Sequence, residues 1–94
     1  MTAEPPVVLE RRDETRNMAR FYVISVEPTL FGQWAVVRHW GRLGTSGQSR
    51  ESWFADLDSA RAESAGWQLR KRGRGYRSAT VESAERASPG FDRV

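Results

Sequence analysis

The sequence lacks cysteine, and its 94 residues include a single histidine and a single lysine. Without thiols, neither a disulfide nor a thiolate metal site can form, and one histidine with scattered carboxylates does not make a zinc site. We therefore expect no metal and no cofactor. No apolar run reaches the roughly 18–20 residues of a membrane span, and residues 1–6 lack the order of a signal peptide. We expect a soluble, cytoplasmic protein without membrane contact.

Signatures of enzymes are also missing. Gly41 and Gly47 have neither the spacing nor the following lysine of a phosphate-binding loop, and the dinucleotide fingerprint is absent. His39 has no acidic residue nearby in the sequence to orient it, which favours a structural or rim position over a catalytic one. No carboxylates pair at catalytic spacing. We expect a protein that is not an enzyme and has no catalytic residue.

The chain has the length and the patterning of one small domain. A chain of this size buries only about 60–65% of its unfolded surface, so its ten aromatic residues are expected to supply much of the core. Alternating apolar residues predict four strands, at 7–12, 20–26, 33–40 and 49–54. The second is apolar on both faces, which predicts a central position. It should form an antiparallel hairpin with the third.

A helix is expected to follow the strands, over residues 59–72. Asp58 offers an N-cap oxygen, and Gly73 offers the left-handed conformation that often ends a helix. Small and apolar residues at helical spacing predict the face that lies on the sheet, formed by Ala62, Ala65, Gly66 and Leu69. We divide the chain into a flexible N-terminus at 1–6, one domain at 7–77 and a flexible tail at 78–94.

Residues 38–50 combine aromatic, glycine and arginine residues in a way that packing alone does not explain. The strand is expected to end at Trp40 and to lead into a loop with three glycines, at 41, 44 and 47, between the arginines 38, 42 and 50. Glycine lets a backbone approach another molecule closely, and guanidinium groups grip phosphates with paired hydrogen bonds. This composition favours a binding loop, whereas an ordinary hairpin turn is the alternative.

A second basic element lies at the end of the predicted helix. It has five positive charges in eight residues, namely Arg70, Lys71, Arg72, Arg74 and Arg77. The helix dipole favours the first three, but it does not account for the two beyond the cap. Residues 38–77 hold nine Arg or Lys against four Asp or Glu, although the whole chain carries only +3. A polyanion is the simplest partner for this local excess.

The ordered set of these residues resembles the WGR domain, a family named after the tripeptide that stands here as Trp40-Gly41-Arg42. The likeness covers roughly residues 7–77 and includes residues 16–22, 30–34, 39–44 with 47–48, and 71–76. The resemblance implies an α+β fold in which one helix packs on a compact antiparallel sheet of about four to five strands.

The resemblance also implies a function. In poly(ADP-ribose) polymerases the WGR domain contacts DNA at strand breaks, where the tryptophan stacks near the 5′-terminal nucleotide and the arginine lies at the DNA and interdomain contact. Carried over, Trp40 becomes the stacking residue and Arg42 the phosphate or relay residue. The catalytic and zinc-finger domains of those polymerases have no counterpart in this chain, so the transferase activity does not carry over.

We therefore expect a nucleic-acid-binding module whose target is DNA. The sequence does not decide whether it prefers strand ends or nicks. The candidate contact residues are Arg38, Trp40, Gly41, Arg42, Arg70, Lys71, Arg72, Arg74 and Arg77. The alternative is a protein-interaction adaptor that uses the Trp40–Arg42 loop and does not touch nucleic acid. A continuous positive surface from Arg42 to residues 70–77 would favour nucleic acid, and an isolated apolar patch around Trp40 would favour a protein partner.

Overall fold

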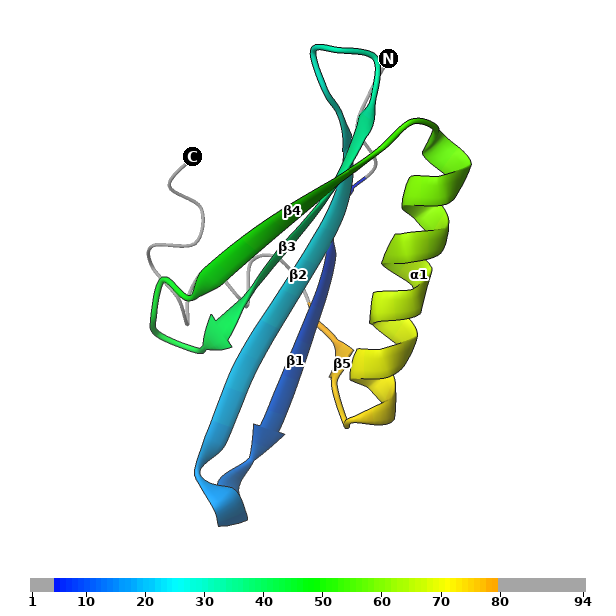
Figure 1. Cartoon of the computed structure of the whole chain (residues 1–94). Coiled ribbons are helices and arrows are strands. Elements are labelled where there is room, and N and C mark those ends of the chain that lie inside the picture. Colours follow the sequence, from blue (N-terminus) through cyan, green and yellow to red (C-terminus); the bar gives the residue numbers. More distant parts are fainter. Residues whose placement is uncertain (1–4, 80–94) are drawn as a thin grey trace.

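A five-stranded antiparallel sheet carries the fold, and one long helix covers one of its faces (Figure 1). The computed structural model describes residues 5–79. The sheet order is β4-β3-β2-β1-β5, and the elements are β1 Val7–Asp13, β2 Met18–Pro28, β3 Trp34–Arg42, β4 Gln48–Phe54, α1 Leu57–Gly73 and β5 Arg77–Ser78. The expected α+β class is confirmed. Within the described residues, no helix is long and apolar enough to cross a membrane.

The central position predicted for the strand at 20–26 is confirmed, because β2 lies between β1 and β3. Its side chains alternate between two clusters. Tyr22, Ile24 and Val26 join the main core beneath α1. Phe21 and Val23 join a smaller cluster on the other face. Since both faces of β2 are buried, this strand fixes the position of everything that packs on the sheet.

The face of α1 that lies on the sheet differs from the predicted one. Ala60 and Ser64 are buried on it, and Leu57 and Trp67 pack against the main core. The predicted stripe was wrong: Leu69, its largest member, is 72% exposed. The large area of Trp67 decides the rotation of the helix. The buried Ser64 hydroxyl accepts a hydrogen bond from Gln68 Nε2, 3.1 Å away, so a polar residue is tolerated in the buried row.

The helix ends also use different residues from those predicted. The N-cap is Asp56, whose carboxylate accepts hydrogen bonds from the Ser59 backbone N–H and hydroxyl at 2.7 and 3.1 Å. At the other end, α1 runs to Gly73 and Arg74 is its C-cap, with φ −97°. The left-handed residue is Gly75, with φ +98°, where the chain turns back toward β5.

The predicted domain boundaries stay predictions. Residues 1–4 and 80–94 lie outside the described part of the chain. Most of the residues predicted to be flexible, 1–6 and 78–94, are therefore among those that are not described. Within the described part, β5 includes Ser78, one residue beyond the predicted boundary at 77. The backbone N–H of Ala79 donates to the carbonyl of Val8, which ties this segment to the edge of β1.

The N-cap supplies a direct test of the helix start. We expect Asp56→Ala to lower the melting temperature by roughly 5 °C and Asp58→Ala to leave it nearly unchanged, as measured by circular dichroism. The hydrogen bonds from Ser59 lower the pKa of the Asp56 carboxyl. The stabilisation by this group is therefore present at neutral pH and lost as pH falls through the lowered pKa. A larger effect of Asp58→Ala would contradict this cap.

Candidate nucleic-acid interface

The Trp40-Gly41-Arg42 tripeptide lies within strand β3 and not in the loop where we expected it. Gly41 pairs with Phe21 of β2, and Arg42 pairs with Arg20. The chain turns only after Arg42, and the next strand begins at Gln48. The motif is therefore held by the regular hydrogen bonds of a sheet, which fixes its side chains more rigidly than a loop would.

The glycines of the motif are explained by close packing. A Cβ on Gly41 would lie 2.7 Å from Gly47 Cα, and a Cβ on Gly47 would clash with the Trp40 carbonyl oxygen and lie 2.8 Å from the Phe21 ring. Gly47 also has φ +71°, a conformation that favours glycine. These two glycines let the turn fold back on the strand, so they do not by themselves indicate a ligand.

His39 completes the support of the turn. Its ring stacks on Phe21, with the ring centres 5.2 Å apart. Its Nε2 lies 2.6 Å from the carbonyl oxygen of Ser46, which can only accept, so Nε2 carries the proton. This arrangement fits the structural role that the sequence favoured for His39.

A groove of about 350 Å³ opens beside the tripeptide, where the ends of several elements meet. Three of its lining residues are the positively charged Arg20, Arg42 and Lys71. The other lining residues are Trp40, Gly41, Gln48 and Tyr76. The lining therefore combines three cations with two aromatic rings and contains no carboxylate.

The sheet register explains why the arginines gather there. Arg11 pairs with Arg20, and Arg20 pairs with Arg42, so that three arginines stand in one row across β1, β2 and β3. Like charges directly opposite each other destabilise a sheet. Within residues 5–79 the ion pairs involve Arg12 with Glu10 and Arg16 with Asp13, and none of the three arginines of the row. An anion bound at this row would relieve the repulsion.

Lys71 brings a fourth cation from α1 to the same place. Its Nζ lies 4.9 Å from the ring centre of Tyr22 and 5.4 Å from that of Tyr76. Burial lowers the pKa of Lys71, and repulsion by Arg74, Arg38 and Arg20 lowers it further. That repulsion means that the electrostatic potential at the groove is positive.

Comparison with known proteins places the chain in a family. Residues 6–83 match the WGR domain. This chain belongs to the WGR domain family. A relative, "Uncharacterized protein y4dW" of Sinorhizobium fredii (strain NBRC 101917 / NGR234), is 45% identical over 69 residues. The match covers 73% of this chain and 34% of that protein, so the chain spans about a third of the relative's length. No solved structure matches the chain.

WGR domains are known as nucleic-acid-binding modules in proteins of the poly(ADP-ribose) polymerase type, and the family is non-catalytic. In this WGR domain the groove brings together four of the residues predicted from the sequence, namely Trp40, Gly41, Arg42 and Lys71. Sequence reasoning missed Arg20, Gln48 and Tyr76, which complete the lining. Arg20 and Gln48 could have been found by extending the hairpin register past Trp40.

Two of the predicted contact residues are used in packing. The guanidinium carbon of Arg38 lies 3.9 Å from the ring centre of Trp67 and 5.4 Å from that of Trp40. The guanidinium carbon of Arg70 lies 4.6 Å from the Trp67 ring centre. These cation–π contacts help to hold α1 on the sheet, and neither arginine lines the groove.

The remaining predicted cations lie around the end of α1. Arg72 Nη2 donates to the Ser78 hydroxyl at 3.0 Å. Arg77 lines a separate hollow with Glu10 and Arg12, and its Nη1 donates to the Tyr76 carbonyl. The exposed Arg74 is close enough to repel the Lys71 ammonium. Of these three residues, Arg74 is the one whose charge acts on a residue that lines the groove, Lys71.

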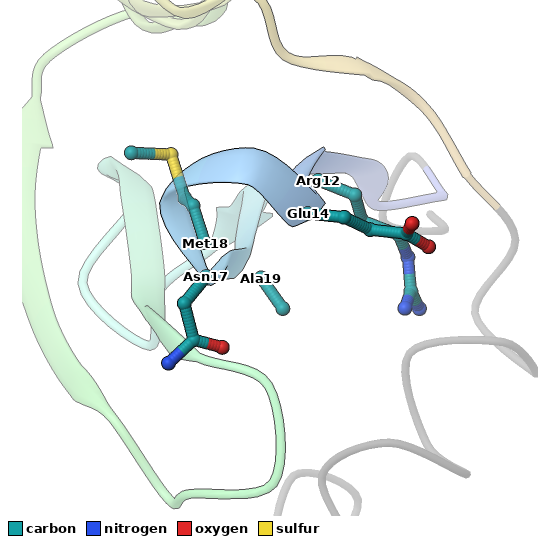
Figure 2. Close-up of a pocket in the computed structure, with 5 residues that line it drawn as sticks. All are labelled: Arg12, Glu14, Asn17, Met18 and Ala19. Atoms are coloured by element: carbon teal, nitrogen blue, oxygen red, sulfur yellow. The ribbon is translucent and has the colours of Figure 1, made fainter.

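A smaller hollow of about 160 Å³ lies at the β1–β2 connection, which contains the short helix η1 Glu14–Arg16. Figure 2 shows that Asn17 and Met18 point away from Arg12 and Glu14. The side chains that line it do not converge on one point. Within residues 5–79 no cluster of acidic or histidine residues could hold a metal ion. Arg42 Nη1 links the hollow to the motif, because it donates to the Asn17 carbonyl at 3.3 Å.

Two glycine substitutions test the packing of the motif. We expect Gly47→Ala to lower the free energy of unfolding by about 1–3 kcal/mol, because it adds both a clash and a strained φ. Gly66 lies inside α1 with open space at its Cβ position. Gly66→Ala should therefore stabilise the domain by about 0.5–1 kcal/mol. Urea unfolding measures both, and equal stabilities would contradict the described turn.

Proposed function

We propose that this WGR domain is a non-enzymatic module that binds nucleic acid, with DNA as its target. The observation that carries the proposal is the lining of the groove, where Arg20, Arg42 and Lys71 surround Trp40 without a carboxylate among them. A folded domain gains no stability from unpaired cations that repel one another. Phosphate groups would supply the missing counter-charge.

The groove residues would make different kinds of contact with nucleic acid, according to their chemistry. Arg20 and Arg42 are backbone partners on paired strands, and each planar guanidinium group can hold a phosphate with two parallel hydrogen bonds. Lys71 adds a point charge from the helix. Trp40 lines the groove but also packs against the main core. A base or sugar would therefore contact the part of its ring that faces the opening, by stacking or edge contact.

The cationic surface extends beyond the groove on two sides. Arg11 continues the row of arginines on β1, and Arg74 follows the end of α1. Together with the three groove cations they offer contacts for four to five phosphates. A duplex bound in this way would lose affinity with salt, with a log–log slope of roughly −4.

The protein-adaptor alternative receives less support from this site. The region around Trp40 is not an isolated apolar patch, since cations line the same opening. An acidic protein segment could still use those cations. A competition experiment separates the two partners, because an acidic peptide that is the true ligand would displace DNA at much lower concentration than inorganic phosphate does.

Fluorescence anisotropy with labelled duplexes tests the proposal. We expect Arg20→Ala and Arg42→Ala each to weaken binding about tenfold or more and to reduce the salt slope by about 1. Trp40→Ala should weaken binding about 5- to 150-fold, with circular dichroism used to confirm that the domain stays folded. The matched control is Arg61→Ala, which removes the same charge ten residues before Lys71, roughly 15 Å away along α1.

Three duplexes resolve the question of strand ends. The wild-type domain is compared on duplexes of the same sequence in three forms, namely closed at both ends, blunt-ended, and closed with one nick, the last two with 5′-phosphates. Tighter binding to the nicked or blunt form would support recognition of ends. Equal affinities would remove the preference for ends and leave general DNA binding. Affinity that does not change between 50 mM and 500 mM salt would contradict the proposed function itself.

A further inference from the structure

Three large apolar side chains are exposed together at the end of the sheet that is far from the groove. Leu30 is 97% exposed and Phe31 is 75% exposed, and both lie in the β2–β3 connection; Trp53 of β4 is 45% exposed. The rings of Phe31 and Trp53 lie 6.1 Å apart, centre to centre. We call these three residues the hairpin patch. Single exposed apolar residues are ordinary, but a cluster of them marks an interaction surface.

The connection that presents the patch is built as a fixed turn. The Thr29 hydroxyl accepts hydrogen bonds from the backbone N–H groups of Phe31 and Gln33, both at 3.2 Å. The Thr29 N–H donates to the Gln33 carbonyl at 2.9 Å, and Gly32 adopts φ +78°. The turn therefore holds Leu30 and Phe31 outward in the free protein, which lowers the ordering cost of binding a partner.

The patch borders a hollow whose charge is opposite to that of the groove. The hollow has a volume of about 420 Å³ and is lined by Glu27, Glu51, Pro28, Thr29, Ala35 and the hairpin patch. It contains two carboxylates and no cation. Within residues 5–79, Glu51 has no ion-pair partner, and Glu27 accepts a hydrogen bond from the Ser25 hydroxyl at 2.7 Å. Nucleic acid would be repelled here, so the hollow is not an extension of the groove.

The hollow also lies apart from the groove in space. The β2–β3 connection projects beyond the sheet, on the opposite side from β5 and the end of α1 (Figure 1). Ala35 and Trp53 are paired neighbours, whereas Trp34, the residue before Ala35, packs against the core beneath α1. The patch is thus on the face away from the helix, and Ala35 is about 23 Å along β3 from Arg42.

The sheet edge next to the patch is open to another strand. Strand β4 is the last strand on its side, and among the described residues no strand pairs with its outer edge. An added strand would place alternate side chains on the patch face, directly beside Glu51 and Trp53. An apolar residue fits beside Trp53 and a cation beside Glu51, two positions apart.

We propose that the hairpin patch and the edge of β4 bind an extended protein segment in which a large apolar residue and an Arg or Lys stand two positions apart. The apolar residue enters the hollow between Phe31 and Trp53. The cation pairs with Glu51, and the backbone of the segment bonds to β4. This site is separate from the groove and does not depend on the nucleic-acid function.

Nuclear magnetic resonance of the labelled domain tests this site with synthetic peptides. The probe is a nine-residue peptide of Ser and Thr with Leu-Thr-Arg at its centre, compared with the same peptide carrying Leu-Thr-Glu. We expect the first peptide to shift the amide signals of β4 and of residues 30–33 and the Trp53 indole signal. The acidic peptide should bind at least tenfold more weakly. Equal shifts with both peptides, or shifts confined to the groove, would overturn the proposal.

Matched variants complete the design. Phe31→Ser should weaken binding of the Leu-Thr-Arg peptide about tenfold or more, whereas Leu69→Ser removes a comparably exposed apolar residue from α1 and should have no effect. Glu51→Lys should reverse the preference toward the Leu-Thr-Glu peptide. DNA binding by Phe31→Ser should equal that of the wild type. Two outcomes would overturn the choice of partner. The first is that the wild type self-associates and Phe31→Ser does not. The second is that the domain binds phosphatidylcholine vesicles but does not bind the peptide.

Discussion

The antiparallel pairing of β2 with β3 is the constraint on which the rest of the structure depends. It places Tyr22 opposite Trp40 and Arg20 opposite Arg42. A shift of β3 by one residue would move Trp40 to the face away from the helix and would separate Arg42 from Arg20. The tight β2–β3 turn around Thr29 and Gln33 fixes the register at one end, and at the other end the Leu43 N–H donates to the Ala19 carbonyl. Core, groove and patch all follow from this pairing.

Much of the fold was predictable because strands obey a simple alternation. The apolar residues on both faces of β2 gave its central position, and the hairpin followed from two strands with a short connection. The helix face was not predictable in the same way. Ser64 and Lys71 stand in the row that faces the sheet and conceal its apolar character, while Ala62 and Ala65 produce a regular but exposed stripe. The packing of the Trp67 indole against the core determined the buried face of the helix, in spite of that pattern.

The candidate site was predictable only in part for a related reason. Trp40 and Arg42 stand out in the sequence, and both line the groove. Arg20 is an ordinary strand residue until its partner on β3 is known. Arg38 has the same composition signal as Arg42, yet it lies four residues earlier and meets Trp67 of the helix. Composition thus identified the region rich in cations, but only the three-dimensional pairing separates the arginines that pack from those that face a ligand.

The position of Lys71 has a chemical consequence, because it is the only lysine in the sequence. The only side-chain amine of the chain therefore lies in the groove, among guanidinium groups that cannot be acylated under the same mild conditions. An acyl group on Lys71 would remove one positive charge and add bulk to the groove that Lys71 and Tyr76 line, without altering any other side chain. The rate at which an amine reagent modifies Lys71 therefore reports how open or how occupied the groove is.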